Sequence, residues 1–470
     1  MVRCFAALGL CLALAACGGG DSSTTTVSGN GLNSLGQSPA VSSNPVQTDN
    51  NLLVSVSDGP RGFQLAPNAN ILYATVTVCS PVNTSLCVSI DHVQVDTGSV
   101  GLRVLASKVK ALNLPPLQLA TSPDPARNAW ECFPFVIGGL WGPNATAVVG
   151  LGRQFTSPLA VQLIEDSTDP AQALQAPDNC IQAADGNLLN SASSLGSNGI
   201  LGIGSTNLDC GSVCLQGSYA TDAAFVQYYA YPPGSTGVAQ CGSNMALCST
   251  AAPSVPANLQ VANPISKLLN SAYRDGMVLV MPAVSNPGAA SASGELILGL
   301  NSVAGAAGLS DNTVPAGTTR VHLGVDPNNL PAYLNITTQL QRGGSPQTFV
   351  SSYLDTGTNG IFFTDNALPA LPLCANSSWY CPLALSTLSA TLSDAGNTGL
   401  NPVPVQFQIG NAEALFSTSN TAFSGAAGAA PSGSTAFAWG MPFFFGKRVY
   451  MSIWDITGPS IAPWYAWTAL

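Results

Sequence analysis

The chain has 470 residues, of which 8% are charged, and a formal net charge of −10. With only 13 Lys and Arg residues it lacks the basic surface that nucleic-acid binding needs, so we expect no nucleic-acid partner. The length suits one large two-lobed protein or two to three domains. Abundant Gly and Pro and scarce helical patterns predict an all-β fold with few short helices.

Residues 1–17 have the pattern of an export signal. Arg3 precedes an apolar run that is too short to span a membrane, and the run ends in Leu-Ala-Ala-Cys at Cys17. This ending resembles the lipobox of bacterial lipoproteins, which implies cleavage before Cys17 and attachment of lipid to its thiol. An ordinary secretory signal is the alternative.

The segment after the signal predicts a tether. Residues 18–50 are mostly Gly, Ser, Thr, Asn and Gln, a composition typical of a flexible linker. Gly18, rather than an aspartate, follows Cys17. By analogy with other lipoproteins this favours the outer membrane, facing the periplasm or the surface, with contact to the membrane through the N-terminal lipid alone.

Ten cysteines remain after the signal and Cys17, and an even number in an exported chain indicates disulfides. Four pairs are near neighbours, which leaves two cysteines for each other, although sequence does not fix connectivity. The candidates are Cys79 with Cys87, Cys132 with Cys180, Cys210 with Cys214, Cys241 with Cys248, and Cys374 with Cys381. A zinc site is disfavoured because the chain has only two histidines, and we expect no metal or cofactor.

Short apolar runs with period-two alternation predict strands along most of the chain. In chain order they are 71–79, 89–98, 101–107, 146–155, 159–166, 196–205, 294–302, 333–341, 349–363 and 437–455. Residues 263–277 are the clearest helix candidate. Residues 205–260 look like loops and contain four cysteines.

One complex pattern occurs twice. "VQVDTGSVGLRV" (93–104) and "SYLDTGTNGIFF" (352–363) each place Asp-Thr-Gly and a hydroxyl residue between apolar runs. Two apolar residues and a glycine follow later in each half, as Ile200-Leu201-Gly202 and Ala438-Trp439-Gly440. We therefore expect an N-terminal lobe over 51–303, with the cysteine-rich segment 205–260 inserted in it, and a C-terminal lobe over 304–470.

The repeated motif predicts a pair of facing carboxylates, Asp96 and Asp355. Two carboxylates a few ångströms apart share one proton, so one can act as a base toward water and the other as an acid toward a carbonyl. The remaining motif residues support these loops. The glycines allow a tight turn, the threonines can form hydrogen bonds to the opposite loop, and the hydroxyl residues that follow can donate to the carboxylates. These supporting residues are Thr97, Gly98 and Ser99 in the first loop and Thr356, Gly357 and Thr358 in the second.

From about residue 70 to its end, the chain resembles the pepsin-like aspartic peptidases. "SNGILGIG" (197–204) and "FAWGMPFFFGKRVYMSIWD" (437–455) look like the segments that thread beside the two catalytic loops. "FPFVIGGLWGPNATAVVGLG" (133–152) is similar to the flap hairpin, with Trp141-Gly142 where the family usually has Tyr-Gly. The resemblance implies a bilobal fold, a cleft that takes a peptide or protein, and catalysis by Asp96 and Asp355. We expect an acidic pH optimum, because the hydroxyls of Ser99 and Thr358 help to keep the lower pKa of the pair low.

More narrowly, the lipobox, the first Asp-Thr-Gly segment, "DCGSVC" and "WGMPFFFGKRV" resemble a bacterial lipoprotein family left as a domain of unknown function. Two departures from pepsin stand out. Arg103 occupies the place of a Trp that supports the flap, and we expect it to stack on Trp141. The segment 205–260 has no clear counterpart, and it could narrow the cleft or bind a partner.

An aspartic endopeptidase that acts as a monomer is the leading interpretation. The alternative is a non-catalytic surface lipoprotein that binds peptide, protein or glycan in its cleft, since altered flap residues can accompany lost catalysis. A Ser-His-Asp hydrolase is disfavoured, because the two histidines, His92 and His322, lie in strand-like segments and no Gly-x-Ser-x-Gly motif is present.

Overall fold

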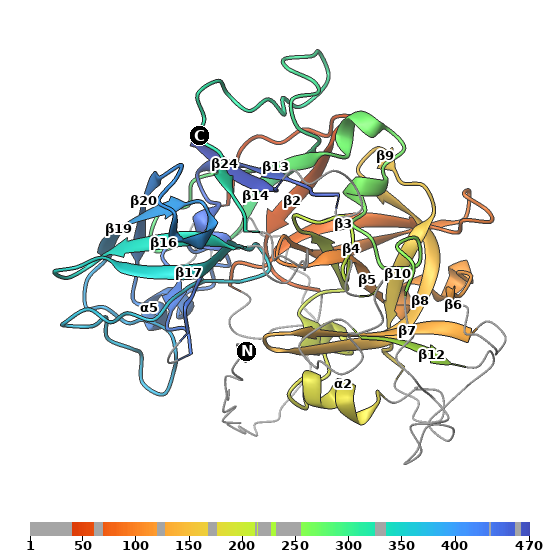
Figure 1. Cartoon of the computed structure of the whole chain (residues 1–470), viewed down its shortest axis with the longest axis horizontal. Coiled ribbons are helices and arrows are strands. Elements are labelled where there is room, and N and C mark those ends of the chain that lie inside the picture. The colour runs from red at the N-terminus through yellow and green to blue at the C-terminus, as the bar shows by residue number, and fades with distance from the viewer. Residues whose placement is uncertain are drawn as a thin grey trace, which may run out of the picture.

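The computed structural model describes residues 40–60, 69–119, 127–167, 176–211, 214, 227–231, 255–324, 335–431, 434–455 and 462–470. These residues are mostly strands with a few short helices, which confirms the all-β prediction (Figure 1). The signal, Cys17 and most of the tether lie outside the described residues. Within the described part, no helix is long and apolar enough to cross a membrane.

Most strands form one large branched network. It comprises β1 (Val41–Ser42), β2 (Asn51–Val56), β3 (Leu72–Cys79), β4 (Cys87–Asp96), β5 (Val100–Leu105), β6 (Gln118–Leu119), β7 (Arg127–Phe135), β8 (Gly138–Leu151), β9 (Gln154–Phe155), β10 (Leu159–Ile164), β11 (Gly199–Ile203), β12 (Gln227–Tyr231), β13 (Gly276–Met281), β14 (Ala292–Leu298), β15 (Val321–His322), β23 (Lys447–Ser452) and β24 (Trp464–Ala469).

A second sheet is built from the later part of the chain, in the order β20-β19-β16-β17-β22-β18-β21. Its members are β16 (Ile336–Gln341), β17 (Gln347–Leu354), β18 (Ile361–Phe362), β19 (Ser386–Ser393), β20 (Val403–Ile409), β21 (Ala427–Gly428) and β22 (Ala436–Trp439). Figure 1 shows β16, β17, β19 and β20 on the left and β3 to β10 on the right, with β2, β13 and β14 across the top between them.

The helices are short. They are α1 (Ala106–Val109), α2 (Asp178–Ala183), α3 (Ala192–Leu195) and α5 (Ala412–Phe416), with 3₁₀ turns η1 (Lys110–Leu112), η4 (Ile265–Lys267), η5 (Ser271–Tyr273), η7 (Ala395–Asn397) and η8 (Met441–Phe443).

An antiparallel sheet joins the two ends of the chain. Its strands run in the order β2-β14-β13-β23-β24-β15, so the C-terminal strands pair with β13 rather than with the second sheet. β13 reads GMVLVM and is buried at every position, as expected for a strand covered on both faces. This sheet therefore connects the parts of the chain that carry the two Asp-Thr-Gly segments.

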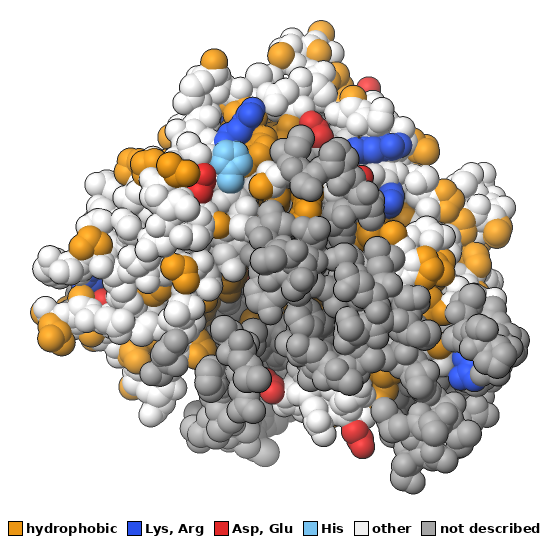
Figure 2. Space-filling view, in the orientation of Figure 1, with side chains coloured by type: hydrophobic (Ala, Val, Ile, Leu, Met, Phe, Trp, Pro, Cys, Tyr) orange, Lys and Arg blue, Asp and Glu red, His pale blue; other side chains and the backbone are white. Residues whose placement is uncertain are grey.

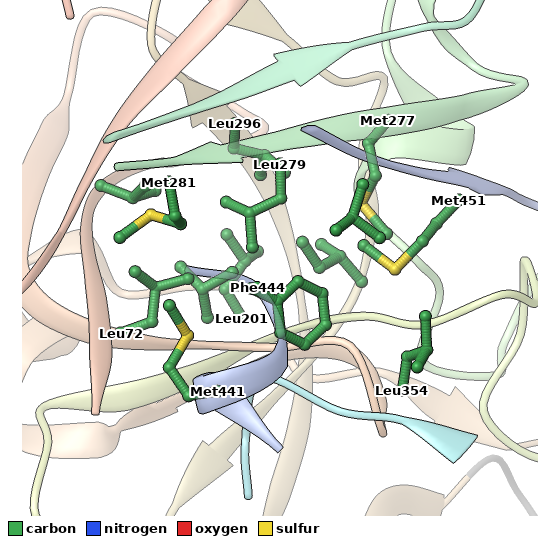
Figure 3. Close-up of a cluster of buried hydrophobic side chains, with 14 of the residues drawn as sticks. Leu72, Leu201, Met277, Leu279, Met281, Leu296, Leu354, Met441, Phe444 and Met451 are labelled. Atoms are coloured by element: carbon green, nitrogen blue, oxygen red, sulfur yellow. The ribbon is translucent and has the colours of Figure 1, made fainter. Parts of the chain in front are cut away.

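A core rich in methionine fills the space beside this sheet. Figure 3 shows Met277 and Met281 of β13 facing Met441 and Met451, with Leu201 of β11 close by. All five are at most 1% exposed. Unbranched methionine side chains adapt to irregular spaces, which suits a core where strands from distant parts of the sequence converge.

The helix expected over 263–277 is not present as such. The segment contains η4 and η5, and β13 then begins at Gly276. Asn263 Oδ1 accepts a hydrogen bond from the Ile265 N–H at 3.0 Å, and Asn270 Oδ1 accepts one from the Ala272 N–H at 3.1 Å. Such local side-chain bonds compete with a continuous helical ladder, so the prediction was wrong.

The cysteines form four of the expected disulfides: Cys79–Cys87, Cys132–Cys180, Cys210–Cys214 and Cys374–Cys381. The fifth expected pair, Cys241 and Cys248, lies outside the described residues. The predicted strands are also present, and β12 adds a strand inside the segment 205–260 that looked like loops.

Removing the Cys132–Cys180 bridge should cost more stability than removing Cys374–Cys381. The two bridges span 48 and 7 residues, and a longer closed loop restricts the unfolded chain more. Loop-closure entropy predicts losses of about 4 and about 2 kcal/mol for the paired Cys→Ser variants. Urea unfolding of both variants measures this, and an equal or reversed ranking would contradict it.

Charged side chains are few and scattered on the face that Figure 2 shows. This agrees with the low content of Lys and Arg in the sequence.

Candidate active site

The two Asp-Thr-Gly segments lie in loops that have the same strand topology. Asp96 ends β4 and β5 leaves its loop, whereas Asp355 directly follows β17 and β18 leaves the second loop. β11 runs parallel to β4 and antiparallel to β5, and β22 runs parallel to β17 and antiparallel to β18. The sequence repeat is therefore a repeat of structure.

The threading strand of the first copy passes against the loop at Gly202. This glycine is the register partner of Asp96. A Cβ at Gly202 would lie 2.7 Å from the backbone nitrogen of Val100, so a larger residue would displace the loop. The two residues before it, Ile200 and Leu201, are buried as predicted.

The second copy repeats this arrangement. The Asp355 N–H donates to the carbonyl of Trp439 at 3.0 Å, which places Gly440 beside the loop. A Cβ at Gly440 would collide with the carbonyl oxygen of Gly360. Ala438 and Trp439 are buried, so the structure places both predicted apolar-apolar-glycine segments at the aspartate loops.

The threonines of the two motifs hold the loops together. The Thr97 N–H donates to Thr356 Oγ1 at 3.1 Å, and the Thr356 N–H donates to Thr97 Oγ1 at 3.0 Å. Each hydroxyl also donates across the junction, Thr97 to the Leu354 carbonyl and Thr356 to the Val95 carbonyl. Both threonines are buried, so this reciprocal set fixes one loop relative to the other.

Each carboxylate accepts two hydrogen bonds from its own loop, one from a glycine N–H and one from a hydroxyl. The bonds are Gly98 N to Asp96 Oδ1 (2.8 Å), Ser99 Oγ to Asp96 Oδ2 (2.5 Å), Gly357 N to Asp355 Oδ1 (2.7 Å) and Thr358 Oγ1 to Asp355 Oδ2 (2.5 Å). These four predicted supporting residues therefore donate to the carboxylates, and the two carboxylates are held in the same way.

The two carboxylates face each other across the junction of the loops. A Cβ at Gly98 would lie 2.7 Å from Asp355 Cγ, and a Cβ at Gly357 would lie 2.5 Å from Asp96 Oδ1. Each carboxylate therefore lies over the glycine of the opposite loop. Asp96 is 6% exposed and Asp355 is partly exposed, so little of the pair is open to solvent.

Asp355 is the carboxylate of this pair that favours its protonated form. Burial, followed by the negative charge of Asp96, raises the pKa of Asp355 to about 8. The hydroxyl of Thr358 opposes this rise by donating to the charged form. Asp355 therefore holds a proton at neutral pH next to the second carboxylate, which is the protonation state that acid–base work on a bound water needs.

The expected flap is a β-hairpin formed by β7 and β8. Figure 1 shows its turn directed toward the middle of the molecule. Trp141 is not at this turn: it pairs with Cys132 along the hairpin and is 3% exposed. Gly142 also packs closely, because a Cβ there would collide with the carbonyl of Leu163.

The expected stacking of Arg103 on Trp141 is wrong. The Arg103 guanidinium lies 3.7 Å from the ring centroid of Phe133, while Trp141 packs against Trp130 and Tyr229 with centroid distances of 5.2 and 5.3 Å. Arg103 still contacts the hairpin, but through a different residue. The cause is burial, because the fully buried guanidinium turns toward carboxylate partners that Trp141 cannot supply.

Neither histidine pairs with a carboxylate of the facing pair. His92 Nδ1 lies 2.8 Å from Asp91 Oδ2, and His322 Nδ1 lies 3.4 Å from Asp394 Oδ2. Each histidine thus has a local aspartate partner.

One group among the described residues has the spacing of metal ligands: Cys374, Cys381 and Glu413. The two sulfurs are joined as a disulfide, so they are not available as thiolates.

Sequence reasoning missed a buried charged cluster next to the site. The side chains of Glu131 and Asp209 are fully buried and both contact Arg103 Nη2, and Tyr228 bonds to Asp209. The sequence did contain a signal for this cluster, because Arg103 is the charged residue in the otherwise apolar run VGLRVL. The structure shows that every residue of this strand is buried. A buried arginine requires carboxylate partners, but the sequence does not say which.

Residues 46–467 match a family model described as "Protein of unknown function (DUF3443)". No curated protein matches the chain.

Proposed function

We propose that this chain, which belongs to the family described as Protein of unknown function (DUF3443), is an aspartic endopeptidase with the pepsin-like bilobal fold that its sequence resembles. The observation that supports this most is the facing pair of Asp96 and Asp355. Each carboxylate accepts hydrogen bonds from a glycine N–H and a hydroxyl. Reciprocal hydrogen bonds between Thr97 and Thr356 join the two loops that carry the carboxylates.

The proposed reaction uses a water bound between the two carboxylates. Asp96 accepts a proton from this water as the oxygen attacks the peptide carbonyl carbon, and Asp355 donates its proton to the carbonyl oxygen. The resulting tetrahedral diol collapses when Asp96 passes the proton that it took from the water to the peptide nitrogen and the C–N bond breaks. One hydroxyl of the diol returns a proton to Asp355 as the new carboxyl group forms, which restores the pair. The raised pKa of Asp355 supports its role as the acid at neutral pH.

The test uses the purified chain from Gly18 onward, incubated with a peptide library between pH 3 and pH 8. Cleavage that a statine-type inhibitor blocks supports the proposal. A folded protein that cleaves no peptide at any of these pH values would refute it.

Cleavage should decline above pH 8. The pKa of Asp355 is raised to about 8, so its carboxyl keeps the proton below this pH and loses it above, which removes the general acid. We expect kcat/KM to fall about ten-fold for each further pH unit on this alkaline side. Measurement between pH 3 and pH 10, with a melting curve at each pH, checks this. An increase in kcat/KM from pH 8 to pH 9.5 would contradict the assignment.

A second candidate is a non-catalytic protein that binds peptide, protein or glycan in the same place. Trp141 favours it, because this residue takes the place of the usual flap tyrosine and yet is buried against Trp130 and Tyr229. Binding of the statine-type inhibitor without any cleavage would select this candidate.

We further propose that the protein is anchored in the cell envelope by lipid on Cys17, with the outer membrane as its site. Cys17→Ala should abolish incorporation of labelled palmitate and release the protein to the soluble fraction. Cys11→Ala, within the signal, is the matched control and should keep the label. Lipid labelling that persists in Cys17→Ala would contradict the lipobox interpretation.

A further inference from the structure

A buried charged cluster lies beneath the β7–β8 hairpin. Arg103 Nη2 lies 2.7 Å from Glu131 Oε1 and 3.0 Å from Asp209 Oδ2, and all three side chains are fully buried. Burial and the negative charge of Glu131 raise the pKa of Asp209, which favours its protonated form.

The guanidinium connects three segments that are distant in sequence. Arg103 belongs to β5, and its Nη1 donates to the carbonyl of Val100 at 2.5 Å, the residue directly after Ser99 of the catalytic loop. Glu131 belongs to β7 of the hairpin. Asp209 lies in the cysteine-rich segment 205–260, directly before Cys210. One side chain therefore bonds to the loop, the hairpin and the inserted segment.

One strand of the inserted segment, β12, pairs with the outer edge of the hairpin. β12 pairs antiparallel with β7 from Asn128 to Cys132. Tyr228 of β12 donates to Asp209 at 3.1 Å and accepts from the Val261 N–H at 2.7 Å. Within the described residues of 205–260, β12 is thus joined to β7 through backbone pairing, and Tyr228 is joined to the cluster through its phenol.

The other side of the hairpin is held as well. The Gly139 N–H donates to the Asn187 carbonyl at 2.9 Å, and the Leu189 N–H donates back to the Gly139 carbonyl at 2.8 Å. The Cys132–Cys180 disulfide ties β7 to α2. Among the described residues, both edges of the hairpin are therefore bonded over part of their length, which restrains its motion.

The cluster is not built for stability alone. Three buried polar atoms around it, Arg103 Nε, Asn144 Oδ1 and Gln162 Oε1, have no hydrogen-bond partner among the described residues. These side chains lie side by side, since Gln162 is the register partner of both Arg103 and Asn144. Well-packed apolar residues commonly stabilise such a site as well as a buried ion pair does, so a role in fixing geometry accounts better for the charges.

We propose that Arg103 is a positioning residue that, through Glu131 and Asp209, fixes the β7–β8 hairpin and the cysteine-rich segment against the catalytic loop. The kinetic consequence rests on the proposed peptidase function, whereas the effect on the hairpin does not. The structure therefore assigns to the described part of this segment, Asp209 and β12, the task of stiffening the hairpin.

The experiment measures hydrogen exchange of β7 and β8 amides in the full chain and in a charge-free variant, Arg103→Met with Glu131→Gln and Asp209→Asn. These changes keep side-chain volume and leave no unpaired charge. We expect exchange of the hairpin amides to rise at least about ten-fold, while amides of β19 and β20 keep their wild-type rates. We expect kcat to fall about ten-fold and KM to change less than two-fold, since a displaced hairpin disturbs the transition state most.

Two further variants keep the outcome decisive. Arg103→Lys retains the charge but lacks the planar fork that holds Val100 on one nitrogen and the two carboxylates on the other, so hairpin exchange and kcat should be intermediate. This variant also serves if the triple variant does not fold. Arg342→Met removes the ion pair with Asp365 in the second sheet and should leave the hairpin unchanged.

Unchanged hairpin exchange in both Arg103 variants would overturn the inference, as would an equal rise in every strand. If wild type cleaves nothing, the peptidase proposal fails, and the exchange data still decide the role of Arg103.

Discussion

Replacing Asp355 by asparagine is expected to reduce peptide cleavage by about 10⁴-fold, because the variant has no proton to donate to the carbonyl oxygen. Asp96→Asn should have an effect of similar size through loss of the base. Both are measured as kcat/KM at pH 6 on one fluorogenic peptide that wild type cleaves.

The loss in Asp355→Asn should not come from unfolding. The folded state keeps the Asp355 proton up to about pH 8, whereas the unfolded chain releases it near the ordinary carboxyl pKa. This raised pKa destabilises wild type as pH rises from about 4 toward 8, so the asparagine variant should melt at an equal or higher temperature at pH 7.

Thr358→Ser is the matched control in the same loop. It keeps the hydroxyl that donates to Asp355 and copies Ser99 of the first loop, so cleavage should stay near the wild-type rate. Thr358→Val removes the donor and should lower activity by much less than Asp355→Asn. If Asp355→Asn retained a tenth or more of wild-type activity, the two-carboxylate mechanism would be refuted.

Gly440→Ala should destabilise the fold and impair the site together. The new methyl group would meet the carbonyl oxygens of Thr358 and Gly360, which are backbone atoms of the Asp355 loop and cannot turn away as a side chain can. We expect a loss of about 3 kcal/mol in the free energy of unfolding. Cleavage by the folded fraction should also fall, because the loop that carries Asp355 must shift.

The matched control for this substitution is Gly344→Ala. A Cβ at Gly344 would meet no atom within 4 Å, so its added methyl group should change stability by less than about 0.5 kcal/mol. Urea unfolding of both variants measures the difference. Equal free energies of unfolding for Gly440→Ala and wild type would show that Gly440 is not packed against the Asp355 loop as described.

Much of the site could be predicted because its pattern is local. Asp-Thr-Gly followed by a hydroxyl contains the carboxylate together with its own two donors, two and three residues further on. Short disulfide loops were predictable for the same reason, since cysteines seven or eight residues apart meet through a single turn. Recurrence of Asp-Thr-Gly between apolar runs then indicated that Asp96 and Asp355 belong together.

The helix expected over 263–277 failed for a local reason that composition hides. Asn263 and Asn270 each bond to a backbone N–H two residues ahead, and these bonds replace the first turn of a helix with a 3₁₀ turn. The apolar spacing was compatible with both outcomes, so the pattern could not choose between them.

The sequence was sufficient for the all-β class and the neighbouring disulfides, because both depend on residues that lie close together in the chain. It was also sufficient for the paired aspartate loops, because the Asp-Thr-Gly pattern occurs twice. The partners of Arg103 depended on the fold. Glu131 is 28 residues away and Asp209 is 106 residues away. Which carboxylate meets a buried guanidinium depends on strand register across β5, β10, β8 and β7, and register is set by the packing of the whole sheet rather than by any single segment.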